Sequence, residues 1–208
     1  MHSNPSFRQA SDAQAIAFAR GRSFGVLTAS SPDGPPLVSH LPFLLNGDGD
    51  MAELHMARPN PIARACKEHL PVTLVVSGPD GYVSPDWYGI EDQVPTWNYA
   101  AVHLTGVLHR LPADRLPDML ARQSAAFEDD IPGKTPWTMD KMTADTKARF
   151  LRMILPFELR IDTVSSTFKL NQNKPDAARL RAAEHIRSGL GSELDGLAQL
   201  MRQPPQAE

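Results

Sequence analysis

The chain has 208 residues, of which 41% are hydrophobic, so it is long enough to form one domain with a real core. Its formal net charge of −3 argues against a protein whose main role is to coat nucleic acid, because such proteins are strongly basic. A single cysteine, Cys66, excludes an intramolecular disulfide. Neither a Sec-type signal peptide nor an apolar run of about 18 residues is visible, so we expect a cytoplasmic protein without a transmembrane helix.

The first third of the chain predicts one helix followed by an antiparallel meander. Ser11 and Gln14 have the spacing of a capping box, which predicts a helix that ends near Gly21. Three alternating segments then predict strands, and two clusters of turn residues separate them. The strands are expected at residues 24–30, 37–45 and 51–56, and the turns at 32–34 and 46–50.

A short helix and two further strands are expected next. Asn60 is a good N-cap and Pro61 suits the first helical position, so a helix should run to about His69. Residues 71–77 are rich in β-branched side chains and predict a strand. The glycines of the segment 78–81 predict a turn, after which a new strand begins at Tyr82 and a loop covers 85–93.

The segment V-P-T-W-N-Y at 94–99 is expected to be a loop that leads into a strand ending near Leu111. Pro95 restricts its own backbone and that of the preceding residue to extended conformations. Trp97 and Tyr99 present flat aromatic faces on either side of the Asn98 amide. Two interpretations stay open: a platform for a planar ligand or a second subunit, and ordinary core aromatics.

Beyond Leu111 the apolar residues recur with the spacing of one face of an α-helix. The pattern predicts a helix over about 116–127, a loop at 129–138, a helix over about 143–153 and a closing strand at 157–162. Two short helices should fill 175–201, broken at 189–191, and residues 203–208 should be disordered. Many short antiparallel strands with peripheral helices indicate a mainly β protein with α (α+β). The turn spacing over residues 24–111 favours a barrel of about six strands over a sandwich.

The strongest physical signal for a ligand lies at Arg58–Arg64. A helix that begins there presents backbone N–H groups and the positive end of its dipole, and Arg58 and Arg64 flank them. This arrangement suits a phosphate. The alternative is a capped surface helix with two solvated arginines.

Other candidate groups give weaker signals. Histidines at positions 40, 55 and 103 fall in predicted strands, but their spacing matches no metal signature, and we predict no metal site. No motif nominates a catalytic residue, and Cys66 is expected to serve packing. The segment K-L-N-Q-N-K at 169–174 has amides that suit either a ligand ring or the attachment of the C-terminal helices. Basic residues that follow, Lys174, Arg179, Arg181 and Arg187, are the candidates for DNA contact.

Several segments together resemble the PaiB family of FMN-binding negative transcriptional regulators. They are F-G at 24–25, S-H-L-P at 39–42, R-P-N-P at 58–61, G-P-D-G-Y-V-S-P-D-W-Y at 78–88, V-P-T-W-N-Y at 94–99, V-H-L-T-G at 102–106 and K-L-N-Q-N-K at 169–174. These segments occur in the family's order and span nearly the whole chain. The resemblance implies a split β-barrel of the flavin-reductase and pyridoxamine-oxidase type, over residues 1–170, with a C-terminal helical extension over 171–208. It also implies a homodimer with FMN at the subunit interface.

The same resemblance implies which residues hold FMN. The second strand would lie along the isoalloxazine, the segment after the third strand would hold the phosphate, and the W-N-Y segment would close the ring site. The implied residues are Ser39, His40, Leu41, His55, Met56, Ala57, Arg58, Asn60, Trp97 and Asn98. Pyridoxamine oxidases carry more arginines and lysines in these strands, which argues against vitamin B6 oxidation. A flavin-binding regulator, a small FMN-dependent oxidoreductase and a haem-handling relative therefore stay as alternatives, and direct DNA binding has little support.

Overall fold

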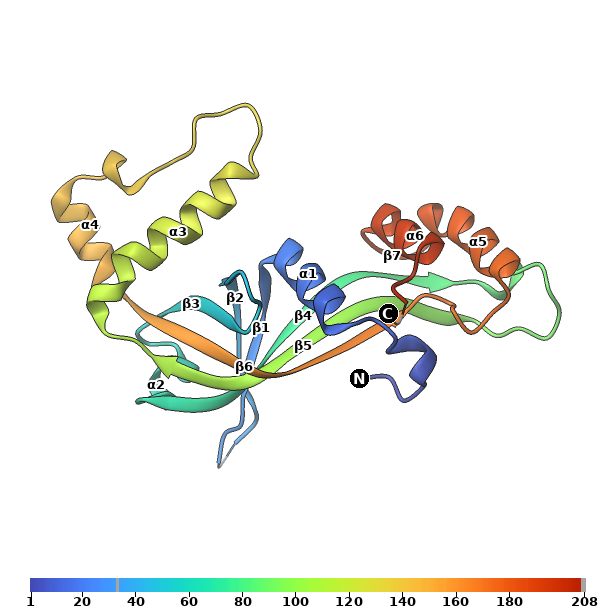
Figure 1. Cartoon of the computed structure of the whole chain (residues 1–208), viewed down its shortest axis with the longest axis horizontal. Coiled ribbons are helices and arrows are strands. Elements are labelled where there is room, and N and C mark those ends of the chain that lie inside the picture. The colour runs from blue at the N-terminus through green and yellow to red at the C-terminus, as the bar shows by residue number, and fades with distance from the viewer. Residues whose placement is uncertain (33, 207–208) are drawn as a thin grey trace. The chain divides into compact units, whose positions relative to one another are not determined.

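The structure is a computed structural model that describes residues 1–32 and 34–206. The predicted turn at 32–34 includes Asp33, and the predicted disorder at 203–208 includes residues 207–208; these three positions lie outside the described residues. The strands are β1 (Phe24–Ala29), β2 (Leu37–Leu45), β3 (Met51–Ala57), β4 (His69–Val83), β5 (Thr96–Arg110), β6 (Ile154–Lys169) and β7 (Gly191–Ser192) (Figure 1). The α-helices are α1 (Asp12–Arg22), α2 (Pro61–Ala65), α3 (Leu116–Asp129), α4 (Ala144–Leu151), α5 (Asp176–His185) and α6 (Leu194–Arg202).

The strands form an antiparallel barrel, as the sequence predicts. The order in the sheet is β1-β2-β3-β6-β5-β4-β7, and an additional pairing of β1 with β4 closes the first six strands of that order. In the first hairpin Phe24 pairs with Pro42 and Ala29 pairs with Leu37. β3 pairs with the first part of β6, from Met51 opposite Arg160 to Ala57 opposite Ile154. The predicted strand number is confirmed, but the sixth strand is β6, which follows the predicted range of 24–111.

The chain divides into two compact units. The barrel unit comprises Ser23–Leu74 and Leu104–Thr163, and the terminal unit comprises Met1–Arg22, Val75–His103 and the chain from Val164 onward. Strands β4, β5 and β6 each contribute residues to both units. The boundary expected at residue 170 stays a prediction. No helix within 1–32 and 34–206 has both the length and the apolar character that crossing a bilayer requires.

The core of the barrel unit follows from strand alternation. Leu27, Phe43 and Leu54, on β1, β2 and β3, are fully buried between strand neighbours that are more exposed. Phe157 of β6 is fully buried as well, next to Pro156, which is also buried. Gly106 of β5 lies so close to β6 that a Cβ there would collide with the backbone of Arg160. The close approach of two strands explains why glycine occupies this position.

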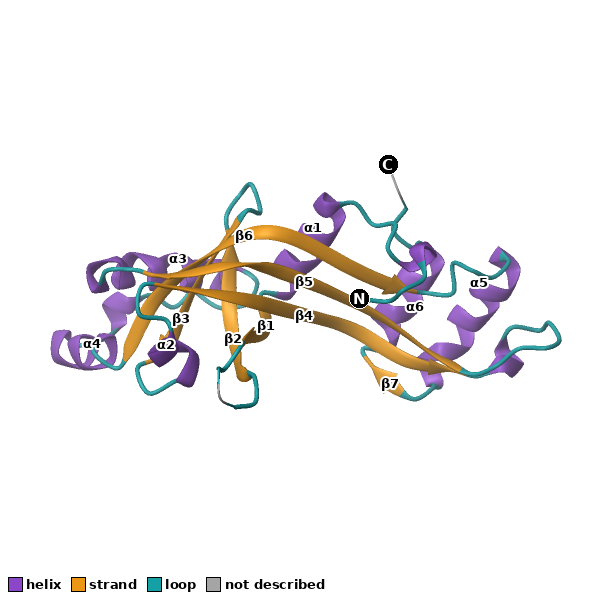
Figure 2. Cartoon of the chain, turned by 90° about the horizontal axis from the view of Figure 1, so that it is seen from below, coloured by secondary structure: helices purple, strands orange, loops and turns teal. Residues whose placement is uncertain are grey.

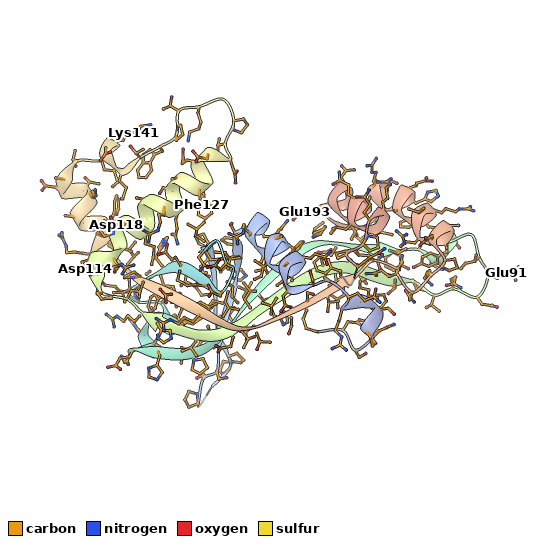
Figure 3. All side chains as sticks on the ribbon, in the orientation of Figure 1. Glu91, Asp114, Asp118, Phe127, Lys141 and Glu193 are labelled. Atoms are coloured by element: carbon orange, nitrogen blue, oxygen red, sulfur yellow. The ribbon has the colours of Figure 1, made fainter. Side chains whose placement is uncertain are left out.

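In the terminal unit the α-helices cover one face of the strands. Phe18 of α1 packs edge-on against Phe168 of β6, with ring centroids 5.3 Å apart. Arg22, at the end of α1, donates two hydrogen bonds to Glu193, the N-cap residue of α6, at 2.5 and 2.7 Å. Glu193 is labelled in Figure 3. Figures 1 and 2 show α1, α5 and α6 on the same side of β4, β5 and β6 in this unit. The opposite face of β6 carries the N-terminal 3-10 helix η1 (Pro5–Phe7): the backbone N–H of His2 donates to Thr167 Oγ1 at 3.1 Å, and Lys169 Nζ lies 6.0 Å from the centre of the Phe7 ring.

Four predicted boundaries are wrong. Helix α2 ends at Ala65 rather than near His69, which is the first residue of β4. Residues 78–81 do not turn, because β4 runs unbroken from His69 to Val83. The W-N-Y segment is not a loop, because β5 begins at Thr96. The closing strand is much longer than 157–162, because β6 extends from Ile154 to Lys169.

The predicted start of the first helix is confirmed. The backbone N–H of Ser11 donates to Gln14 Oε1 at 2.9 Å, and the backbone N–H of Gln14 donates to Ser11 Oγ at 3.3 Å. These two bonds are the capping box that the sequence predicts.

Candidate functional site

The segments expected to hold the isoalloxazine and the phosphate meet at the start of α2 in the barrel unit. The side-chain Nδ2 of Asn60 donates to Ser39 Oγ of β2 at 2.9 Å. Asn60 Oδ1 accepts from the backbone N–H of Ile62 at 2.9 Å and of Ala63 at 3.4 Å, which is the predicted N-cap. Asn60 therefore joins the end of β3 to β2 while it caps α2.

Because of the same cap, the backbone N–H groups at the start of α2 are not available to a phosphate. Pro61 has no N–H, the next two N–H groups bind Asn60 Oδ1, and the N–H of Arg64 donates to the Asn60 carbonyl at 3.0 Å. The first-turn amides of α2 are thus already used. An anion at this position would depend on side chains, which are Arg58 and Arg64.

Arg58 is fixed by the connection between α4 and β6. Its Nε donates to the carbonyl of Arg152 at 2.5 Å, and its backbone N–H donates to the carbonyl of Met153 at 3.0 Å. Arg58 is exposed, and its two terminal guanidinium nitrogens make no hydrogen bond with the described residues. A planar guanidinium held at one edge in this way presents its other edge for a bidentate contact.

The predicted site residues on β2 and β3 divide between the two faces of the strands. Leu41 and Met56 are each 3% exposed and belong to the barrel core. His40 and Ala57 are exposed on the outer face, and His55 is partly buried beside α3. The side chains of Leu41 and Met56 therefore pack in the core and cannot touch a ligand on the surface. The residues on the outer face are accessible to one.

His55 is held by α3. Its Nδ1 lies 3.0 Å from Gln123 Oε1, and Gln123 Nε2 donates to the Glu53 carbonyl at 2.9 Å. Arg122 binds the Glu53 carboxylate through two nitrogens, at 2.5 and 3.1 Å, and fixes the same helix to β3. Burial lowers the pKa of His55, and the hydrogen bond with Gln123 opposes part of that shift. The imidazole is thus biased towards its neutral form.

A hydroxyl-lined pocket of about 340 Å³, which no local sequence pattern predicts, lies on the outer surface of the barrel unit. Thr28 Oγ1 donates to the Thr73 carbonyl at 3.1 Å, and Thr73 Oγ1 lies 3.1 Å from Thr105 Oγ1. The lining residues are Thr28, Ala29, Ser30, Pro36, Pro71, Val72, Thr73 and Thr105. Leu27, beside Thr28, pairs with Ser39 of β2, so the pocket adjoins the predicted isoalloxazine strand. Threonines on three strands that are distant in sequence gave no local signal.

The two remaining predicted residues belong to the terminal unit and differ in exposure. Trp97 is 44% exposed and packs edge-on against Tyr82, with centroids 6.2 Å apart. Asn98 is fully buried, and neither atom of its amide has a hydrogen-bond partner among the described residues. Successive strand residues point to opposite faces, so Trp97 faces outward and Asn98 faces the interior of this unit.

The K-L-N-Q-N-K segment holds the terminal unit together. The hydroxyl of Tyr88 donates to Asn171 Oδ1 at 3.4 Å, and Lys174 Nζ lies 4.2 Å from the centre of the Tyr88 ring. Lys169 Nζ donates to Thr96 Oγ1 at 2.5 Å at the start of β5. These contacts attach the segment to Tyr88 and to the start of β5. They therefore favour a structural role for the segment over contact with a ligand.

Neither a nucleophile nor a metal centre emerges from the described residues. Cys66 is fully buried, its Sγ donates to the Leu108 carbonyl at 3.5 Å, and burial raises the pKa of the thiol. Within 1–32 and 34–206, no three histidine, cysteine or acidic side chains gather in an arrangement that holds a metal ion.

Comparisons with known proteins agree with this fold. Residues 1–163 match the family model described as "Putative FMN-binding domain". The Bacillus subtilis protease synthase and sporulation protein PAI 2 is 28% identical over 200 residues, which are 95% of this chain and 95% of the relative. The Saccharomyces cerevisiae protein YKL070W is 30% identical over 124 residues, which are 54% of this chain and 72% of the relative.

Two solved structures share the fold at low sequence identity. The FAD and heme binding protein from Mycobacterium smegmatis has a TM-score of 0.55 and 19% identity, with 78% of this chain and 73% of that chain covered. The flavocytochrome Anf3 from Azotobacter vinelandii has a TM-score of 0.56 and 17% identity, with 81% and 72% covered.

Proposed function

The chain belongs to the FMN-binding domain family, and from that premise we propose that it binds FMN on the barrel unit, between β2, β3 and the start of α2. The observation that carries the proposal is the hydrogen bond of 2.9 Å between Ser39 and Asn60. It brings the end of β3 beside β2, so that one ligand can touch both of the segments implied by the family resemblance.

Arg58 is the group best suited to the FMN phosphate. Its Nε is engaged by the Arg152 carbonyl, which orients the guanidinium and leaves the terminal nitrogens for phosphate oxygens. Arg64 is exposed one turn into α2 and adds a second positive charge. Since the first-turn amides of α2 are occupied by Asn60, we assign phosphate binding to these side chains rather than to the helix terminus.

The isoalloxazine would lie along the outer surface of β2. His40 is exposed there, and the hydroxyls of Thr28, Thr73 and Thr105 border the adjoining pocket of about 340 Å³. A bound flavin supplies the redox chemistry itself, so the protein needs only to hold and orient the ring.

We further propose that the protein works as a homodimer. The outward face of β4 and β5 in the terminal unit carries Tyr82, Trp97 and Tyr99, and helices α1, α5 and α6 lie on the other side of these strands. Aromatic residues on an exposed sheet face are typical of the centre of a subunit interface. Under this proposal the W-N-Y segment faces the second subunit, and Trp97 reaches a flavin only if the partner's site lies against it.

A role in transcription, by analogy with the family's regulatory label, would not use the C-terminal helices for direct DNA contact. Arg179 is only 7% exposed and binds the carbonyls that end α6, and Arg187 pairs with Asp195 at 3.1 Å. Lys174 donates to Gln93 Oε1 and lies over the Tyr88 ring, so three of the four basic candidates are engaged within the protein. A small FMN-dependent oxidoreductase stays as the alternative, and NAD(P)H oxidation by the FMN-loaded protein distinguishes it.

The test is a comparison of FMN with riboflavin, which lacks the phosphate. Charge-assisted hydrogen bonds contribute about 1.5–3 kcal/mol each, so FMN should bind at least about tenfold more tightly than riboflavin. Arg58→Ala should remove that preference and leave riboflavin affinity unchanged, whereas Arg115→Ala, at an exposed arginine on the 3-10 turn before α3, should change neither affinity. Equal affinities of the unmodified protein for both flavins would overturn the phosphate assignment.

A further inference from the structure

A second pocket lies between α3 and α4 in the barrel unit, apart from the residues assigned to FMN. Its volume is about 180 Å³. Figure 3 shows the side chains of this segment, with Phe127 labelled on α3 and Lys141 on the 3-10 turn η4 (Met139–Lys141) that precedes α4. The lining residues are Leu120, Ser124, Trp137, Met139, Met142, Lys147, Phe150, Leu151 and Ile154.

The pocket has the chemistry of an aromatic binding site. Trp137 and Phe150 offer ring faces, and the thioethers of Met139 and Met142 adapt to a ring and make favourable sulfur–aromatic contacts. A cavity of roughly 150 Å³ lined by apolar side chains is large enough for one benzene molecule. The volume of about 180 Å³ therefore accommodates one six-membered ring with a short substituent.

Lys147 supplies the one charged group in the lining. It stands on α4, where it is partly buried, and its ammonium makes no hydrogen bond or ion pair with the described residues. A cation beside an apolar cavity attracts a ligand that combines an apolar body with a negative end. Ser124, on the facing helix, adds a hydroxyl that can donate to the same negative group.

The loop that closes the pocket is anchored rather than left loose. The backbone N–H of Trp137 donates to Glu128 Oε2 at 2.7 Å, and Lys134 pairs with the same carboxylate. Glu128 stands at the end of α3, so it fixes the aromatic wall of the pocket to the helix that forms the opposite wall. Pre-organisation of this kind lowers the entropic cost of binding.

From these contacts we infer that the pocket between α3 and α4 binds a small aromatic carboxylate, with its ring among Trp137, Met139 and Phe150 and its carboxylate at Lys147. The wall of the pocket adjoins the proposed FMN site, because Leu151 and Ile154 flank the two carbonyls, of Arg152 and Met153, that Arg58 binds. The inference does not depend on FMN binding, since none of the nine lining residues belongs to the proposed flavin set.

The test uses phenylacetate and its uncharged amide, phenylacetamide, with the full-length chain in both its flavin-free and its FMN-loaded form. Amide resonances are followed by two-dimensional NMR during the titration. A ligand of about ten non-hydrogen atoms should bind with a dissociation constant of about 0.1–1 mM. Phenylacetate should shift the resonances of Leu120, Ser124 and Ile154 and bind at least about fivefold more tightly than the amide.

Two variants and a control make the test specific. Lys147→Met keeps the aliphatic stem and removes the charge, so it should abolish the preference for the carboxylate while the amide still binds. Ser124→Phe should fill the cavity and abolish binding of both compounds. Lys67→Met, at an exposed lysine that follows α2, should leave both affinities unchanged. Absence of saturable shifts up to about 10 mM, or a carboxylate preference that survives Lys147→Met, would overturn the inference.

Discussion

Nδ1 of His55 lies 3.0 Å from Oε1 of Gln123. A second hydrogen bond fixes the orientation of the Gln123 amide, and with it the donor in this contact. The Gln123 amide must turn its Nε2 to the Glu53 carbonyl, 2.9 Å away, so its oxygen faces the imidazole as an acceptor. His55 therefore donates through Nδ1–H, and in its neutral form Nε2 holds a lone pair. Nitrogen-15 NMR of the histidine side chains should find His55 as the Nδ1–H tautomer.

The same residue makes stability depend on pH. Burial lowers the pKa of His55, so the unfolded chain binds a proton more readily than the folded chain. The free energy of unfolding should rise with pH between the folded pKa and the ordinary value near 6.5, and fall on acidification through that interval. Denaturant unfolding at several pH values should show a flatter profile for His55→Gln than for the unmodified protein. His69→Gln, at an exposed histidine, should leave the profile unchanged.

Arg179 is expected to be the most important cation for the stability of the terminal unit. It is 7% exposed, donates to the carbonyls of Met201 and Arg202, and pairs with Asp176 at 2.8 Å. Arg179→Ala leaves these acceptors without a donor and should lower the free energy of unfolding by about 2–4 kcal/mol.

Arg187 provides the matched comparison. Its side chain is 49% exposed and its partner Asp195 is 84% exposed, so Arg187→Ala should cost no more than about 1 kcal/mol. Chemical denaturation of the two variants measures both values. A similar cost for the two substitutions would contradict the structural role assigned to Arg179.

Two glycines should respond in opposite directions to alanine. A Cβ at Gly78 would collide with the ring of Phe18, so Gly78→Ala should destabilise the protein by about 1–3 kcal/mol through overpacking. Gly21 lies in the last turn of α1 with no atom within 4 Å of an added Cβ, so Gly21→Ala should stabilise the helix by about 0.5–1 kcal/mol. Thermal unfolding of the two variants gives the signs.

Trp97 tests the proposed dimer. Trp97→Ala removes an aromatic ring that is 44% exposed, so the folded subunit should lose little stability. A residue near the centre of an interface should nevertheless raise the dimer dissociation constant at least about tenfold. Light scattering at low micromolar concentration should then approach the mass of one chain, 22.8 kDa. Ile90→Ala, at an equally exposed position, should leave the mass at twice that value; an intact dimer in both variants would sink the interface proposal.

The sequence predicted those parts of the fold that depend on residues close together in the chain. Asn60 caps α2, and Ser11 and Gln14 cap α1, because a cap depends only on residues within one turn of each other. The β1–β2–β3 meander was predictable for a similar reason, since short turns leave little choice of pairing. The segments of the predicted site on β2 and α2 were identified from the family motifs, and the bond between Ser39 and Asn60 joins them.

What escaped prediction depends on contacts between distant segments. Gly78 and Gly81 indicated a turn, but they sit within β4 because Phe18 of α1 and Leu197 of α6 pack against them. The sequence near residues 78–81 does not indicate that these two helices pack there. The predicted closing strand was shorter than β6. Burial does not alternate along much of β6, so the sequence there lacks the period-2 pattern by which a strand is predicted. The hydroxyl pocket was missed because its threonines come from three separate strands.

The composition of the terminal unit has a consequence for the order in which the chain folds during synthesis. Helix α1 is made first, yet Phe18 packs on Phe168, 150 residues later, and Arg179 is satisfied only once Met201 and Arg202 have been added. The barrel unit, in contrast, is complete in sequence at Thr163. We therefore expect the barrel unit to gain protection from proteolysis on the ribosome while the first 22 residues still wait for their partners. Nascent chains arrested far enough beyond Thr163 for that residue to have left the ribosomal exit tunnel should be cut within α1 and resist cleavage within β1–β3.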